Sequence, residues 1–190
     1  LDNTPTITIS GSRNMWIMAQ EKVKTLLKHN NAQLKGNIAL VDRTGNLISV
    51  ITIVEWMFSG VKKRYLGIFP MPGVSEKDIE ESDKFGAVIH QNLIKNNLDN
   101  LQPQLLAIGA VKIKPFLITV YKTGNKIFKK WSNFIINKKE TRKGWLKVFK
   151  VYLLVAIWVI SPIVYILHLL TFPLRIRKTR KDLEYYKGIN

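Results

Sequence analysis

Residues 151–174 read VYLLVAIWVISPIVYILHLLTFPL and contain no Asp, Glu, Lys or Arg. A helix needs about 20 apolar residues to cross the hydrocarbon core of a bilayer, so this stretch is long enough. It also contains four aromatic side chains of the kinds that settle at membrane interfaces, namely Tyr152, Trp158, Tyr165 and Phe172. The alternative is a buried core helix of a soluble domain. Basic residues on both flanks favour the membrane interpretation.

The positive charge of the chain is unevenly distributed. Residues 1–100 hold 12 Lys and Arg against 10 Asp and Glu, whereas residues 101–190 hold 18 against 3, so the second half has a net charge of +15 out of +17. A pI near 10.1 is compatible with nucleic-acid binding. Because the charge brackets an apolar span and no nucleic-acid motif is present, we expect anionic membrane lipids as the partner and no nucleic acid. The expected location is the membrane, with the globular part cytoplasmic.

A strand–helix–strand unit is predicted at the start of the chain. Thr6–Ser10 is β-branched and alternating, Met15–Lys28 has apolar residues at helical spacing, and Asn37–Val41 is a second apolar strand. Two strands joined by a helix of this length are typical of a parallel α/β sheet.

The rest of the chain suggests four parts. They are an α/β domain at 1–97, a basic amphipathic linker at 98–150, the membrane segment at 151–174 and a basic tail at 175–190. Leu47–Val54 is apolar and fits either a strand or a buried helix. Ser75 and Asp78 predict the capped start of a helix that reaches about Asn96, with a buried stripe of Phe85, Val88, Ile89 and Leu93. Since the chain begins at Leu1, we expect a fragment or a processed chain.

One loop has the character of a ligand site. The predicted cofactor-binding residues are Ser10, Gly11, Ser12, Arg13, Asn14 and Trp16. They follow a parallel strand and open a helix, where α/β proteins bind ligands and where backbone N–H groups favour anions. Asn14 is either the helix N-cap or a polar contact, and Trp16 either packs in the core or flanks an aromatic cofactor. No cysteine, metal motif or nucleophile motif occurs, so metal sites are not expected and catalytic residues stay unassigned.

Three stretches resemble the second half of flavodoxin-like proteins, and more closely the bacterial dialkylresorcinol condensing enzyme group. They are ISGSRNMW at 9–16, GNIALVD at 36–42 and FPMPGV at 69–74. The resemblance covers roughly residues 5–97, so we expect the C-terminal part of a five-stranded parallel sheet with helices on both faces. It also implies FMN as cofactor, with residues 10–16 beside the isoalloxazine ring and the phosphate-binding loop outside this chain.

The resemblance further implies a role in alkylresorcinol biosynthesis, by ring condensation or aromatisation of a lipophilic, acyl-derived substrate. A flavin would accept a hydride in the oxidation, and membrane attachment suits long alkyl chains. Two alternatives stay open at this point. One is an NAD(P)H-dependent FMN oxidoreductase or quinone reductase at the membrane, and the other is a non-catalytic membrane-tethered scaffold.

The sequence also leaves open how the apolar segment meets the membrane. The two flanks are equally basic, with six Lys and Arg in Lys138–Lys150 and six in Arg175–Lys187. Charge asymmetry therefore assigns no orientation. Pro162 lies near the centre, where it removes one helix hydrogen bond and favours a bend. A kinked single span and a bent helical hairpin in one leaflet both fit.

Overall fold

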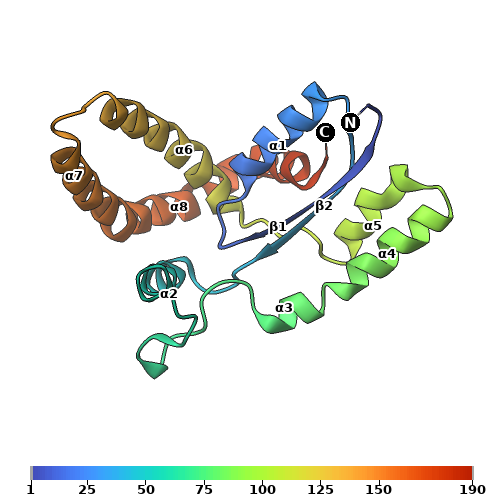
Figure 1. Cartoon of the computed structure of the whole chain (residues 1–190), viewed down its shortest axis with the longest axis horizontal. Helices are drawn as coiled ribbons and strands as arrows, with labels where there is room; N and C mark the ends of the chain where they lie inside the picture. The colour runs from blue at the N-terminus through green and yellow to red at the C-terminus, as the bar shows by residue number, and fades with distance from the viewer. Residues whose placement is uncertain (1, 190) are drawn as a thin grey trace. The chain divides into compact units, whose positions relative to one another are not determined.

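The computed structural model describes residues 2–189, without the side chains of Asn46, Leu47, Met57 and Phe58. The chain forms two compact units. Unit 1 comprises residues 1–113 and 183–190, and unit 2 comprises residues 114–182. The structure is mostly helical, with one two-stranded parallel sheet and a long apolar helix near the C-terminus (Figure 1).

The sheet of unit 1 confirms the predicted strand–helix–strand order. Strand β1 (Pro5–Ser12) pairs in parallel with β2 (Gln33–Val41), and helix α1 (Ile17–His29) connects them. The register places Ile9 opposite Ile38. Both strands are a few residues longer than the period-2 pattern indicated, because backbone pairing continues into the polar residues at their ends.

Helices flank the sheet on both faces, as Figure 1 shows for α1 and for α5 (Leu101–Ala107). A Cβ atom at Gly36 of β2 would lie 3.1 Å from Leu105 Cδ1, so α5 packs closely on the strand. Leu101 and Leu105 are fully buried. This helix, preceded by the 3-10 turn Leu98–Asn100, lies in a range for which the sequence suggested a linker. The start of that range is therefore part of the core of unit 1.

The stretch that fitted either a strand or a helix is helical. Helix α2 (Asn46–Ser59) contains Leu47–Val54 and ends at Gly60. Gly60 takes a left-handed conformation with φ 70° and donates its N–H to the Trp56 carbonyl, which a glycine does without steric penalty. A 3-10 turn at Tyr65–Gly67 follows.

The helix predicted from Ser75 to about Asn96 is divided in two. Ser75 caps α3 (Glu76–Glu80) by accepting a hydrogen bond from the Asp78 N–H, as the capping motif predicted. The chain then turns, and α4 (Asp83–Ile94) follows. Phe85 is buried as expected, but Leu93 is 55% exposed, so its assignment to the buried stripe was wrong. Asn92 takes the buried position and donates its side-chain N–H to the Val88 carbonyl and to Gln104.

Unit 2 is built from three helices and a π-helical turn. They are α6 (Pro115–Ile136), α7 (Arg142–Val155), the π turn Ala156–Ile160 and α8 (Ser161–Lys187), whose last residues belong to unit 1. The helical run changes direction where α7 meets α8 (Figure 1). Because Pro162 has no N–H to donate, a π turn directly before it is a natural place for this bend.

The described residues contain two paired strands, and the wider flavodoxin-like architecture is not confirmed. The edge of β2 away from β1 is partly covered, since the Ala39 N–H donates to the Ala110 carbonyl at 2.8 Å. The fold class is therefore established as a parallel two-stranded sheet with helices on both faces, joined to a helical unit that contains the apolar segment.

Candidate functional site

The first three residues of the predicted site lie in β1 rather than in a loop. Ser10, Gly11 and Ser12 pair with Ala39, Leu40 and Val41 of β2. The Ser10 hydroxyl donates to the Ile38 carbonyl at 3.4 Å, which ties it to the sheet. The Ser12 hydroxyl oxygen is buried and has no hydrogen-bond partner among the described residues. A side chain at Gly11 would point into open space, so this glycine is available to a ligand from outside.

The last three residues of the predicted site lead into α1. Trp16 occupies the N-cap position and is 5% exposed. Its ring therefore packs in the core, which agrees with the core alternative and leaves little surface for a cofactor. Asn14 is also buried but is not the N-cap, because α1 begins one residue after Trp16. Arg13 is half-buried in the bend that directly follows β1.

A small cavity lies at the carboxyl end of β2. It has a volume of about 80 Å³. It is lined by Ala39, Leu40 and Val41 and by charged side chains from other segments, namely Arg43, Asp78, Glu81, Lys84 and Lys112. Arg43 forms an ion pair with Asp78, which is itself buried. Small-molecule sites usually enclose roughly 300–1,000 Å³. At about 80 Å³ this cavity is smaller than such sites.

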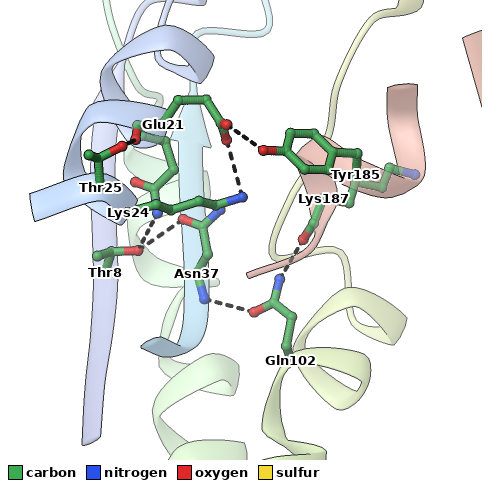
Figure 2. A network of polar contacts seen from close by, with 9 residues as sticks. Thr8, Glu21, Lys24, Thr25, Asn37, Gln102, Tyr185 and Lys187 are labelled. Atoms are coloured by element: carbon green, nitrogen blue, oxygen red, sulfur yellow. Dashed lines mark hydrogen bonds and ion pairs between the residues drawn. The ribbon is translucent and has the colours of Figure 1, made fainter. Parts of the chain in front are cut away.

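A chain of polar contacts crosses the interior of unit 1, and sequence reasoning did not find it (Figure 2). Gln20 of α1 donates to the Thr8 hydroxyl at 2.8 Å, and this hydroxyl donates to the Asn37 side-chain oxygen at 3.2 Å. The Asn37 backbone N–H donates to Gln102 Oε1 at 2.7 Å. Gln102 Nε2 in turn donates to the Lys187 carbonyl at 2.7 Å. Gln102 thus joins the sheet to the C-terminal residues of the chain.

A second set of contacts attaches the same C-terminal residues to α1 (Figure 2). The Tyr185 hydroxyl donates to Glu21 Oε2 at 2.8 Å, and Lys24 Nζ lies 3.2 Å from Glu21 Oε1 and 5.1 Å from the centre of the Tyr185 ring. The hydrogen bond to Glu21 and its negative charge raise the pKa of Tyr185, which lies beyond the apolar segment 151–174. Tyr186 next to it is 8% exposed. Residues 185–187 are therefore an integral part of unit 1.

In unit 2, an aromatic seam joins α6 to α7. The Trp131 ring centre lies 5.4 Å from that of Phe149 and 5.3 Å from that of Tyr152, and Phe134 meets Trp145 edge-on at 4.8 Å. The apolar side of α6 thus has a partner inside unit 2. Its lysines remain outside the seam, and Lys126, Lys129 and Lys130 are exposed.

The apolar segment itself is not buried by the described protein. One helical run, Arg142–Lys187, is long and apolar enough to cross a membrane, and none of its most apolar 18-residue window is buried. Large apolar side chains are exposed along its whole middle part, among them Val155, Val159, Ile163, Leu167 and Leu170. An apolar surface of this extent marks an interaction site. A helix of this length and exposure is compatible with the membrane-associated location that the sequence predicted.

The three histidines are distant from one another in the chain, and no cluster of metal-binding side chains occurs among the described residues. His29 ends α1 and His90 lies exposed on α4. The ring of His168 lies 5.4 Å from that of Phe116 and 5.7 Å from that of Phe172. Neither of these two neighbours of His168 can bind a metal ion.

No protein-family model, curated protein or solved structure matches this chain. The resemblance to flavodoxin-like proteins therefore stays a prediction from the three motifs. The structure itself offers two features for a functional argument. One is the polar framework of unit 1, the hydrogen bonds that link Gln20, Thr8, Asn37, Gln102 and Lys187. The other is the exposed apolar and basic surface of unit 2.

Proposed function

We propose that this chain is a membrane-attached protein in which unit 2 binds an anionic phospholipid bilayer and holds unit 1 at its surface. The observation that carries the proposal is the 24-residue charge-free segment, which is exposed along its length and followed and preceded by basic residues. The side chains of a core helix are mostly buried by protein, whereas no residue in the most apolar 18-residue window of this helix is buried. A bilayer supplies the missing apolar environment.

The charge of unit 2 supports an anionic lipid surface as the partner. Residues 114–182 contain 16 Lys and Arg against two acidic residues, Glu140 and Asp182, which is a net charge of +14 out of the chain's +17. Each basic residue near an anionic membrane surface contributes about 1 kcal/mol, and salt weakens this attraction. Unit 1, with a net charge of +3, contributes little to it.

Flotation with lipid vesicles tests the proposal. The chain should float with phosphatidylcholine vesicles and, at low chain concentration, several-fold more with vesicles that also contain phosphatidylglycerol. Replacing Lys126, Lys129 and Lys130 by Gln should reduce the preference for the anionic vesicles. The matched control replaces Lys22, Lys28 and Lys95 of unit 1, which are equally exposed, and should leave it unchanged. A chain that stays with the soluble fraction in both lipid mixtures would refute membrane attachment.

A second candidate function follows from the motif resemblance, namely a flavodoxin-like protein of alkylresorcinol biosynthesis that acts on a lipophilic, acyl-derived substrate. Parallel strands joined by α1, with helices on both faces of the sheet, support it. Attachment to a membrane would place unit 1 near substrates with long alkyl chains. The described cavity at β2 does not fit FMN, so any flavin would need residues beyond those that line it.

The flavin content of the protein purified in detergent from its native membranes separates the catalytic alternatives from a scaffold. Bound flavin supports either the alkylresorcinol role or an NAD(P)H-dependent oxidoreductase, and NAD(P)H oxidation with a quinone favours the latter. If flavin binds at residues 10–16, Gly11→Val should weaken it by filling the open space beside the strand, and Arg13→Ala should weaken it less. A protein free of flavin would support the non-catalytic scaffold.

A further inference from the structure

The two ends of unit 2 join the same folded unit. The chain leaves unit 1 after Ile113 and returns to it at Leu183. The return is secured by contacts within unit 1, because Gln102 binds the Lys187 carbonyl and Tyr185 binds Glu21 (Figure 2). The residues that follow the apolar segment therefore cannot lie across a bilayer from the residues that precede unit 2 while these contacts persist.

Because the chain leaves and re-enters the same folded unit, we infer that both basic flanks of the apolar segment lie on one face of the membrane. Residues 151–174 then enter and leave the same leaflet. The inference rests on the proposed membrane attachment and adds its topology. A chain that starts and ends on one side of a bilayer crosses it an even number of times, so one full span by residues 151–174 would require a second span within unit 2.

The second span is not available among the described helices of unit 2. Helix α6 has 22 residues and would be about 33 Å long, enough to cross. However, it carries four lysines along its middle, at positions 122, 126, 129 and 130. Lysine side chains at the centre of a bilayer are strongly unfavourable. Helix α6 therefore suits the headgroup region. Among the residues that the structure describes, one run, Arg142–Lys187, meets the length and composition of a membrane helix.

The bend at the π turn gives the apolar segment the shape that a re-entrant path needs. Residues 151–161, which end in the π turn and Ser161, and residues 163–174 form two apolar arms on either side of Pro162, each about 17 Å along the chain at 1.5 Å per residue. This length is about half of a hydrocarbon core of roughly 30 Å. Two arms that meet at the bend would reach about the bilayer centre and return. The basic residues that end both arms then lie at one headgroup layer.

Thiol labelling on sealed vesicles tests the topology, and the absence of native cysteine makes each introduced thiol the only one. Single cysteines replace Gln91 in unit 1, Asn137 between α6 and α7, and Glu184 after the apolar segment, all of which are exposed. A Lys181→Cys variant also reports on the residues after the apolar segment, and replaces Glu184→Cys if that substitution disturbs the fold. The chain is added to preformed vesicles, and the floated fraction is treated with a membrane-impermeant maleimide.

We expect the cysteines at 91, 137, 181 and 184 to react to the same extent in intact vesicles, and a cysteine at Leu167 to react only after detergent is added. Protection of position 181 or 184, with position 91 reactive, would establish a full span and overturn the inference. Protection of position 137 would place α6 across the bilayer and also overturn it. Reaction at position 167 in intact vesicles would show that the segment is not inserted. Failure to float instead refutes the proposed membrane attachment, and is recognised before any labelling.

Discussion

The polar framework of unit 1 makes Gln102→Leu the most informative stability test. Gln102 is 3% exposed, and its side chain accepts from the Asn37 N–H and donates to the Lys187 carbonyl, both at 2.7 Å. Leucine has a similar size and makes neither bond. The substitution leaves the N–H of Asn37, a fully buried residue, without its acceptor.

The magnitude follows from these two bonds. A buried N–H left without a partner costs about 1–3 kcal/mol, and the loss of an ordinary hydrogen bond costs about 0.5–1.5 kcal/mol. The Lys187 carbonyl is only partly buried and regains some hydration, while leucine gains some apolar burial. We therefore expect the free energy of unfolding of unit 1 to fall by about 2–3 kcal/mol.

Urea denaturation in detergent measures this change, with tryptophan fluorescence as the signal. Replacing Trp131, Trp145 and Trp158 of unit 2 by Phe leaves Trp16 and Trp56 of unit 1 as reporters. The matched control is Gln91→Leu, the same chemical change at an exposed position of α4, which should alter stability by less than about 0.5 kcal/mol. If Gln102→Leu behaves like this control, the proposed framework does not stabilise unit 1.

Three further predictions are tested by urea denaturation or, for the last, by amide hydrogen exchange. Leu105→Ala should lower the stability of unit 1 by about 2–5 kcal/mol because Leu105 is fully buried against β2, whereas Leu93→Ala at an exposed site should change it by less than about 1 kcal/mol. Gly60→Ala should lower the free energy of unfolding by about 1–2 kcal/mol, because φ at this position is 70°. Gly86→Ala inside α4 should raise it by about 0.5–1 kcal/mol, because alanine favours a helix and its Cβ would meet no other atom. Equal effects of the two substitutions would contradict this reasoning. Trp131→Ala should speed amide exchange in α7 by removing the ring contacts with Phe149 and Tyr152, and unchanged exchange would show that the aromatic seam does not hold α6 to α7.

Local patterns predicted the elements that depend on neighbouring residues. The alternating strand at residues 6–10, the helical spacing after Met15 and the capping of α3 by Ser75 are present in the structure. Each depends on backbone geometry and side chains a few residues apart, so each is readable from the chain alone. The ambiguity at Leu47–Val54 reflects the same limit, because a short apolar run has no period that separates a strand from a buried helix.

Long-range contacts decided what the sequence could not indicate. Leu101 and Leu105 lie in the range 98–150, for which the sequence suggested a basic amphipathic linker, yet packing on β2 makes residues 101–107 a core helix. Proline at position 103 is tolerated because it lies in the first turn of α5, where its N–H would have no helical partner. The placement of Trp16 in the core follows equally from tertiary packing.

By itself, the sequence determined that this protein has a strand–helix–strand start, a charge-free 24-residue segment and a strongly basic second half, because composition and period are properties of the chain. Only the tertiary structure decided that the C-terminal residues belong to the same unit as the N-terminal sheet. That decision depends on hydrogen bonds such as Gln102 to Lys187 and Tyr185 to Glu21, which join residues 85 and 164 positions apart. No local pattern encodes such pairs, and they are what restricts how the apolar segment can meet a membrane.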